Sequence, residues 1–390
     1  MNNNIKIELH LIQNFAPSCL NRDVTNTPKD CEFGGVRRAR ISSQCTKHSV
    51  RASEQFGQIL REIGGVRTRF LITEIAKRYS GADNPPDEVV KVIADIFKAG
   101  GIERPEVKKG EEETQEKDTT KIILFLDNTA IDDMTRVIRE NWSGLADKKD
   151  AVVNKLGEIL ADAVKSPDIA LFGRMIEVKA STPFGKRNLR VDASCQVAHA
   201  ISTHRADLDL NFYTAVDDLN PASETGAGMM GETGFNSACF YRYSLLDRKQ
   251  LADNLGDERL ADDVIRAFIE ASVRAIPTGK QNSFAAQNPP SFGLVVVRKN
   301  GSPCSLANAF ASPVRVIPGG DEDLVGVSIQ ALDKLHSGMK RVYGDSDIVG
   351  EAVFQINYDD RLGNLAAMDK GSLAAAIDAA MEAVRRAAEV

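Results

Sequence analysis

The sequence predicts an α+β protein, because strand and helix patterns alternate along its 390 residues. Near the N-terminus a period of two is typical of a half-buried strand; its apolar members are Ile5, Ile7, Leu9 and Leu11, and its polar members are Lys6, Glu8 and His10. A short strand over 36–41 and a helix to about Ile63 follow. Strands recur over 194–203, 237–246 and 292–298, with an amphipathic helix over 260–275 before the last. When two long insertions are left out, the expected elements follow the ferredoxin-like or RRM-like order of strand, helix, strand, strand, helix, strand.

Two long insertions interrupt that order. Residues 66–165 form the first, which we interpret as a unit with its own small core; helices are expected over 66–79, 87–98, 132–140 and 149–164, and a buried strand over 121–127. Within it, the charge-dense stretch 108–118 is typical of a loop. The second insertion, residues 207–234, is acidic and rich in glycine. A polar loop over 276–290, a helix over 324–343 and a terminal helix over 373–387 complete the expected elements.

Composition narrows the class of protein. The net charge of −6 argues against general adhesion to nucleic acids, while 43% hydrophobic and 27% charged residues are ordinary for a globular chain. The sequence has no apolar run long enough for a membrane span and no N-terminal signal pattern, so we expect a cytoplasmic protein. Its six cysteines form no CxxC pair, which favours free thiols over a zinc or redox motif.

One basic stretch stands out against this acidic background. Between Phe33 and Arg51 there is no Asp or Glu, and the cations there are Arg37, Arg38, Arg40, Lys47 and Arg51. Gly34 and Gly35 just before them permit positive φ or the close approach of another molecule. A local excess of positive charge on an acidic chain indicates a polyanion partner.

The helix after this stretch can present its cations on one side. Ser42 or Ser43 is expected as its N-cap, and a helix N-terminus favours phosphate. At about 100° per residue one face carries Gln44, Lys47, His48 and Arg51, while another carries Cys45, Ala52, Phe56, Ile59 and Ile63. A solvated basic face is the alternative; the missing acids, the adjacent glycines and the cap favour phosphate binding.

No catalytic constellation emerges from the spacing of reactive residues. The TGK at 278–280 lacks the glycine that a phosphate-binding loop needs, since position 274 is Arg. His199 and His204 are five residues apart, which is wrong for two metal ligands on one helical face. The acid pairs at 207/209 and 217/218 are more typical of a solvated hairpin than of a cation site. We expect no cofactor and no metal.

Several short blocks together resemble a known family. They are SCLNRD at 18–23, FGGVRRARISSQ at 33–44, LFGRM at 171–175, AHAISTH at 198–204, YTAVDDL at 213–219, FYRY at 240–243 and SLANAF at 305–310. In this order they resemble the CasC family, the repeated backbone subunit of the type I-E CRISPR Cascade complex. The resemblance implies an RRM-like palm at 1–60, 190–205 and 232–390, a helical fingers insertion at 61–189 and a thumb hairpin at 206–231.

The same resemblance implies a function. Family members polymerise along a CRISPR guide RNA (crRNA) and hold its phosphates, so that its bases can pair with target DNA whatever the spacer sequence. The expected partners are crRNA, target DNA through the guide, other copies in a helical filament and other Cascade subunits, with no membrane. By family position the phosphate contacts would be Arg22, Lys29, Arg38, Ser42, Gln44 and Lys47; Arg37, Arg40 and Arg51 join them from the basic stretch, and Lys280 and Gln281 from the later loop. Val36 and His48 depart from the basic residues that the family carries at these positions.

Other side chains are expected to meet bases. The resemblance implies that a thumb wedges into the guide and displaces one base at regular intervals, with Met175 as the opposing wedge; the expected residues are Met175, Tyr213, Thr214 and Met230. A thioether or an aromatic ring can replace base stacking. Phe212 could instead close a small core within the hairpin.

Alternatives to this function remain open. One is a metal- or histidine-dependent ribonuclease of the wider RRM-like CRISPR superfamily, with His10, His48, Asp23 and Asp30 as its candidates. Another is an RNA-binding protein unrelated to CRISPR. Lys148, Lys149 and Lys155 could meet target DNA, although a solvated helix face explains them better.

Overall fold

The computed structural model describes residues 4–105, 119–215, 229–317 and 319–389. The chain divides into two compact units. The first comprises Met1–Phe56, Cys195–Lys249 and Ile265–Val390; the second comprises Gly57–Ser194 and Gln250–Val264. The sequence analysis expected an insertion at 61–189, and it did not assign 250–264 to that unit.

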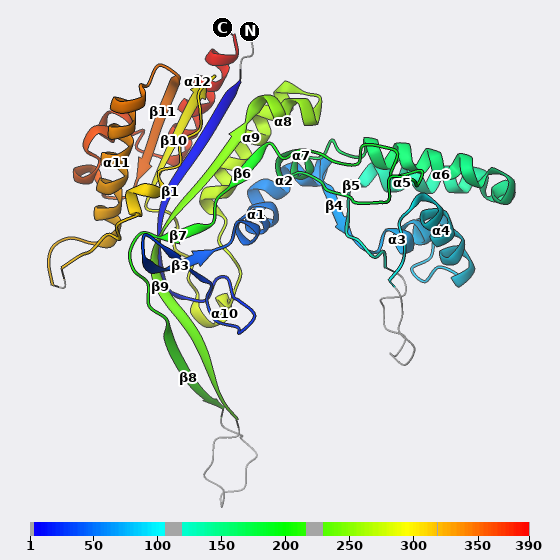
Figure 1. Ribbon diagram of the computed structural model, residues 1–390, viewed down its shortest axis with the longest axis horizontal. Helices are drawn as coiled ribbons and strands as arrows, with labels where there is room; N and C mark the ends of the chain where they lie inside the picture. Colours follow the sequence, from blue (N-terminus) through cyan, green and yellow to red (C-terminus); the bar gives the residue numbers. More distant parts are fainter. Residues whose placement is uncertain (1–3, 106–118, 216–228, 318, 390) are drawn as a thin grey trace, which may run out of the picture. The chain divides into compact units, whose positions relative to one another are not determined.

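The first unit is built on one antiparallel sheet (Figure 1). Its strand order is β11-β10-β1-β9-β7-β3-β2, with β6 and β8 pairing with β9. The strands are β1 (Ile5–Ser18), β2 (Asp30–Phe33), β3 (Val36–Ile41), β6 (Cys195–Val197), β7 (Ala200–Ser202), β8 (Asp209–Ala215), β9 (Met229–Asp247), β10 (Phe292–Lys299) and β11 (Ile348–Gln355). In chain order the central strands β10-β1-β9-β7 run fourth, first, third, second, which confirms the expected α+β, ferredoxin-like arrangement. Strand β11 was not predicted; it extends this core beside β10.

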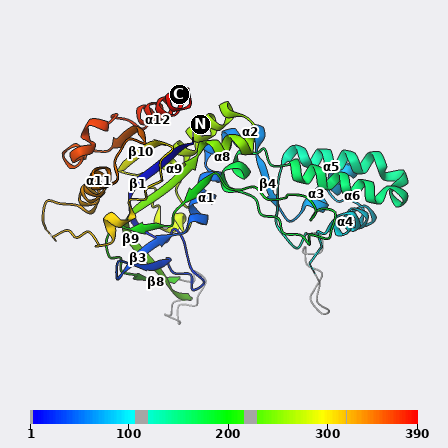
Figure 2. The same ribbon diagram turned by 45° about the horizontal axis from the view of Figure 1, so that its top comes forward.

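Helices cover both faces of the sheet. The unit contains α1 (Ser43–Ala52), α10 (Gln281–Phe284), α11 (Leu324–Tyr343), α12 (Leu373–Glu389) and the end of α9 (Glu258–Arg274), and α8 (Arg248–Leu255) begins at its border. On α11, Val325 and Ile329 pack with Ile12 and Val296 of the sheet. Helix α12 packs on the opposite face, where a Cβ built on Gly350 would lie 2.4 Å from the Cβ of Ala383 (Figure 1; Figure 2).

Two sequence expectations for this part of the chain were wrong. Strand β1 is not half-buried, because α11 covers its polar face and leaves Glu8 and His10 no more than 1% exposed. The helix expected to continue to Ile63 stops at Ser53, whose ψ of 152° is extended. The Ser53 hydroxyl then accepts a hydrogen bond from Phe56 N at 3.3 Å, which starts a new helix, α2 (Glu54–Ile63).

The second unit packs helices around a two-stranded sheet. Strands β4 (Gly65–Thr68) and β5 (Leu124–Asp127) pair antiparallel. Its helices include α3 (Leu71–Ser80), α4 (Asp87–Gly100), α5 (Asn128–Asn141), α6 (Leu145–Asp162) and α7 (Pro167–Phe172), and most of α2 and α8 and the start of α9 also belong to this unit. Its core includes Ile75, Phe97, Leu126, Ile138 and Leu156, each at most 1% exposed. The expected helices over 87–98, 132–140 and 149–164 are confirmed, but residues 66–68 are strand because they pair with β5. The predicted loop at 108–118 lies outside the described residues.

Among the described residues, no helix combines the length and apolarity that a membrane span requires.

Candidate nucleic-acid interface

The basic helix α1 begins where the sequence predicted. Ser42 is its N-cap, and the Ser42 hydroxyl accepts a hydrogen bond from Cys45 N at 3.3 Å. The first turn has no acidic residue, and Arg51 lies in the last turn. Gln44 and His48 are exposed, while Lys47 and Arg51 are half-buried. The expected polar face of this helix is therefore accessible. Ser42 itself is only 5% exposed, and its hydroxyl caps the helix.

The hairpin of β2 and β3 turns on the glycine pair. Gly34 and Gly35 have φ of +62° and +74°, a backbone conformation that residues with a side chain rarely adopt. A Cβ on Gly34 would lie 1.7 Å from Ala311 O, so close packing within the unit requires this glycine. Gly35 has nothing within 4 Å of its Cβ position and faces open space.

Of the three arginines of β3, Arg37 and Arg40 both contact Asp30 of β2. Arg37 is 66% exposed at its side chain and pairs with Asp30 Oδ2 at 2.9 Å. Arg40 donates through Nε to Asp30 O at 3.0 Å and contacts His199 Nδ1 through Nη1 at 2.9 Å. The basic stretch contains no acid of its own, but Asp30 of the adjacent strand offsets part of its charge.

Arg38 is not available to a phosphate, which corrects the expectation for this residue. It is 0% exposed, and within the part of the chain that the structure describes its guanidinium donates to backbone carbonyl oxygens, those of Phe33, Ser202, Thr203, Phe310 and Ala311. Burial lowers the pKa of Arg38 from its ordinary value. Arg38 thus ties β3 to the end of β7 and to the 3-10 helix η3 (Ala307–Phe310).

The loop that carries Arg22 and Lys29 folds back onto the start of α1. Asp23 Oδ1 accepts from Thr25 N at 2.9 Å and from Thr27 N at 3.1 Å, so the loop is shaped by its own aspartate. Asn21 Oδ1 accepts from Ser42 N at 2.9 Å. Arg22 is exposed and donates to Asn26 Oδ1, while Lys29 is half-buried.

The later loop with Lys280 and Gln281 lies against the same region. A Cβ on Gly279 would be 2.3 Å from Leu20 O, so this loop packs on the backbone just before Arg22. Lys280 donates to Thr233 Oγ1 of β9 at 3.2 Å. Gln281 uses its amide inside its own loop, donating to Pro277 O and Ala286 O, while its Oε1 is buried and has no hydrogen-bond partner among the described residues. Gln281 therefore shapes the loop, and the direct RNA contact expected for it stays a prediction.

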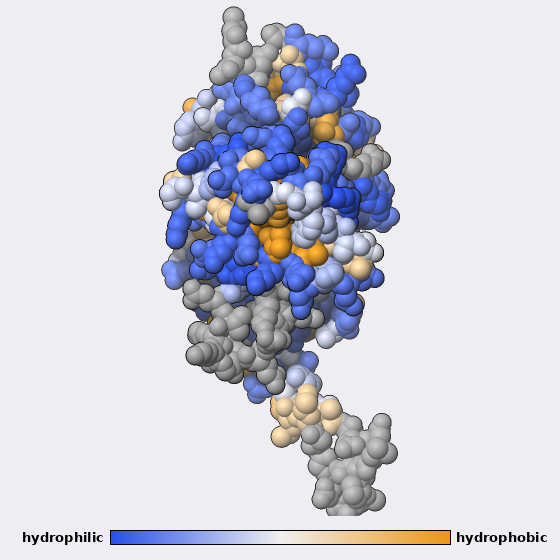
Figure 3. All heavy atoms as spheres, turned by 90° about the vertical axis from the view of Figure 1, so that its right-hand side faces the viewer, coloured by the Kyte–Doolittle hydropathy of each residue, from blue (hydrophilic) through white to orange (hydrophobic). Residues whose placement is uncertain are grey.

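The β8–β9 hairpin presents exposed apolar side chains. Strand β9 continues from the sheet into this hairpin, which projects from the first unit (Figure 1). Apolar surface is visible just before the grey tip (Figure 3). The exposed members are Leu208 at 51%, Leu210 at 63%, Phe212 at 59%, Tyr213 at 41%, Met229 at 55% and Met230 at 66%.

Phe212 does not close a core within the hairpin. The sequence analysis overlooked Leu208 and Leu210, although a period of two through Phe212 marks them. The expected acid pair at 217/218 lies outside the described residues.

The register places Tyr213 and Met230 on opposite faces of the hairpin. Tyr213 pairs with Gly231, and Thr214 pairs with Met230. Paired residues project to one face, and successive residues of a strand alternate. A Cβ on Gly231 would lie 2.5 Å from Tyr213 Oη, so the tyrosine ring covers this glycine. Thr214 and Met230 share the other face with Leu210 and Phe212.

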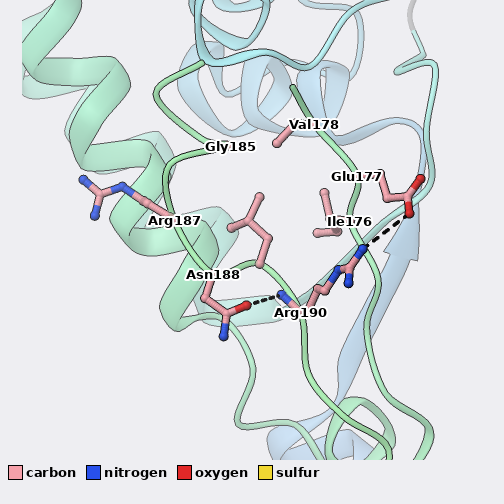
Figure 4. A pocket seen from close by; sticks show the side chains of 8 residues that line it. Ile176, Glu177, Val178, Gly185, Arg187, Asn188 and Arg190 are labelled. Carbon is pink, nitrogen blue, oxygen red and sulfur yellow. Dashed lines mark hydrogen bonds and ion pairs between the residues drawn. The ribbon is translucent and has the colours of Figure 1, made fainter. Parts of the chain in front are cut away.

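In the second unit Met175 is 65% exposed. The segment that follows it lines a hollow of about 380 Å³ together with Gly185 and residues 187–190. At its rim Arg190 Nη2 lies 3.6 Å from Glu177 Oε1, while Arg187 points away toward Glu158 of α6 (Figure 4). Lys148 and Lys155 are exposed on α6 and Lys149 is half-buried there, and Lys155 pairs with Glu158.

Three of the residues considered for a ribonuclease, His10, Asp23 and Asp30, contact other residues of the fold. His10 is buried, with Nδ1 2.9 Å from Tyr241 Oη. Asp23 shapes its own loop, and Asp30 pairs with Arg37. Over the described ranges, no group of three or more His, Cys, Asp or Glu could hold a metal ion.

Comparison with known proteins decides the family. Residues 7–382 match the family of CT1975-like proteins. The chain belongs to this family.

Solved structures contain chains of similar fold. A chain of a "CRISPR RNA-guided surveillance complex, pre-nicking" is 29% identical, with a TM-score of 0.81 over 97% of this chain and 99% of that one. A chain of a second "CRISPR RNA-guided surveillance complex" is 23% identical with a TM-score of 0.70, again over 97% and 99%, and shares the fold. No curated protein matches the sequence.

Proposed function

We propose that this CT1975-like protein is the repeated, guide-RNA-binding backbone subunit of a type I-E CRISPR Cascade complex. Its similarity to a chain of a CRISPR RNA-guided surveillance complex extends over 97% of its length at 29% identity, which supports a place in such a complex. The short sequence blocks that resemble the CasC family support the finer assignment to type I-E and to the backbone position.

The convergence of separate segments of the first unit carries the proposal. Asn21 bonds to the start of α1, Gly279 packs on Leu20, and Lys280 bonds to Thr233 at the base of the hairpin. These contacts gather Arg22, Lys29, Lys47 and Lys280 from three stretches of the chain. Cations from loops and a helix N-terminus suit a phosphate backbone, which they hold without reading its sequence.

This arrangement supports each part of the proposed role. Guide phosphates lie along the basic residues, and guide bases remain free to pair with target DNA. The projecting hairpin, with exposed apolar side chains on both faces, needs partner surfaces, which further copies on the same RNA supply. Other Cascade subunits complete the particle. We propose no intrinsic nuclease activity. Cleavage of RNA or DNA by the pure chain, abolished by His48→Ala, would instead favour the ribonuclease alternative.

Purification with its nucleic acid tests the proposal. The full chain is expressed in a cell that carries a CRISPR array, and any RNA that remains bound is sequenced. The proposal expects array transcripts with many different spacers, in proportion to their abundance. Absence of RNA, or enrichment of one RNA sequence unrelated to the array, would contradict it.

A further inference from the structure

Arg174 is a buried arginine that joins several segments of the second unit. It is 3% exposed, and its guanidinium donates to the carbonyl oxygens of Leu189 at 3.1 Å, Phe125 at 3.2 Å, Ala163 at 2.9 Å and Ala161 at 3.4 Å. Burial lowers its pKa to about 10, which still leaves the group protonated near neutral pH. Ala161 and Ala163 lie at the end of α6, where carbonyl groups lack helical partners and a cation is favourable.

The backbone of Arg174 is fixed as firmly as its side chain. Arg174 N donates to Val191 O at 3.0 Å, and Val191 N donates to Arg174 O at 2.9 Å. The preceding Gly173 has φ of +78°, and a Cβ there would lie 2.9 Å from the same Val191 O. The chain therefore enters this segment in one conformation.

Met175 lies between two buried anchors. Arg174 and Ile176 are 3% and 4% exposed, whereas Met175 between them is 65% exposed. In an extended chain successive side chains point to opposite sides, so burial of the two neighbours directs Met175 outward. An exposed thioether has three rotatable bonds and would otherwise sweep a wide volume.

We propose that Arg174 is the positioning residue for the Met175 wedge, because it anchors the backbone from which this side chain meets guide-RNA bases. The inference rests on the proposed function, in which Met175 displaces a base. A planar fork reaches carbonyl oxygens of three segments at once, which a lysine ammonium with its single nitrogen does not. The role is thus specific to arginine and not to positive charge.

Base displacement can be followed directly. Guide RNA is made with 2-aminopurine at each position in turn, and its fluorescence rises where a base is unstacked. The full chain is assembled on this RNA as wild type, Met175→Ala, Arg174→Lys and Gly173→Ala. Arg190→Lys is the matched control, because it makes the same chemical change in an arginine whose side chain is 66% exposed.

The expected pattern separates positioning from binding. Wild type raises fluorescence at regular intervals, and Met175→Ala loses that rise. Arg174→Lys and Gly173→Ala lose it to the same extent, while the salt dependence of RNA binding stays that of wild type because the basic residues of the first unit are unchanged. Arg190→Lys keeps the rise. Arg174→Lys combined with Met175→Ala is no worse than Met175→Ala alone.

Three other outcomes have distinct meanings. A loss in Met175→Ala without a loss in Arg174→Lys or Gly173→Ala overturns the positioning role. A normal rise in Met175→Ala overturns the wedge and the inference with it. Failure of the wild type to bind RNA overturns the proposed function itself. If Arg174→Lys does not fold, Gly173→Ala decides, since it displaces the segment and retains the arginine.

Discussion

The Nη1 atom of Arg38 donates a hydrogen bond to the backbone carbonyl oxygen of Thr203 at 2.9 Å. The adjacent Arg37 faces solvent and pairs with Asp30. Two neighbouring arginines of one strand thus have different tasks. Arg38 holds the β2–β3 hairpin on the unit, and Arg37 adds charge to its surface.

This difference predicts opposite effects of mutation. Arg38→Met leaves buried carbonyl groups without donors, so the free energy of unfolding should fall by about 2–4 kcal/mol in a urea titration. Arg37→Met, the control, should change it by less than about 0.5 kcal/mol. A stable Arg38→Met protein whose RNA binding became less sensitive to salt would show that Arg38 is a phosphate ligand after all.

Lys47 on α1 is predicted to neutralise a guide phosphate. Each such contact on a single strand contributes about 0.7 to the slope of log K against log salt concentration. Lys47→Ala should lower the slope by about that amount for RNAs of unrelated sequence. Lys334→Ala on α11, an exposed lysine outside the candidate interface, should leave it unchanged. An unchanged slope in Lys47→Ala, or a loss with one RNA sequence only, would contradict the prediction.

The two faces of the β8–β9 hairpin are predicted to act separately. Because Tyr213 and Met230 project to opposite faces, Tyr213→Ala and Met230→Ala should each impair assembly on RNA, with additive effects in the double variant. Both side chains are more than 40% exposed, so thermal unfolding of the RNA-free chain should change little. Assembly is measured by sedimentation on a long guide RNA. A double variant no worse than either single variant would mean that both residues serve one contact.

The Glu351 side chain, 7% exposed, predicts that acid destabilises the fold. Burial alone would raise its pKa, but hydrogen bonds from His336 Nε2 and Lys340 Nζ, each 2.6 Å long, outweigh it and lower the pKa to about 2. The unfolded carboxyl binds a proton more readily than the folded one. The stabilisation is therefore complete above pH 4.5 and is lost as pH falls toward 2.

A pKa shift of this size in Glu351 corresponds to about 3 kcal/mol in the free energy of unfolding. Glu351→Gln should lower stability at neutral pH and flatten its decline in acid, as measured by urea titrations at several pH values. Glu382→Gln on α12 is the control, because that carboxylate is 63% exposed at its side chain. A wild-type acid decline that persists in Glu351→Gln would assign the effect to other carboxyl groups.

Periodicity in the sequence predicted the core order of strands and helices. It did not predict which helix covers each face of the sheet. The pattern of β1 predicted a solvated face with Glu8 and His10, and it could not show that α11, more than three hundred residues later, covers that face. Likewise Phe56 fits the apolar face of a continuous helix. The break at Ser53 depends on a local cap, which competes with helix continuation.

The sequence located the candidate site, but it did not show which of its residues are buried and which are exposed. Charge and glycine spacing marked residues 33–51, yet whether Arg37 or Arg38 points inward depends on Phe310, which lies 272 residues from Arg38 in the chain. Met175 was expected as a wedge from the family resemblance, whereas the proposed anchoring role of Arg174 required the positions of Phe125, Ala163 and Leu189. The opposite faces of Tyr213 and Met230 required the strand register.

Binding of the purified full chain to single-stranded RNAs of equal length and unrelated sequence, over a range of salt concentrations, tests the central claim most directly. The account predicts equal affinities and one common negative slope, because phosphates carry the binding and bases remain free. Affinities that differ widely with sequence and barely change with salt, or no RNA binding at all, would contradict it.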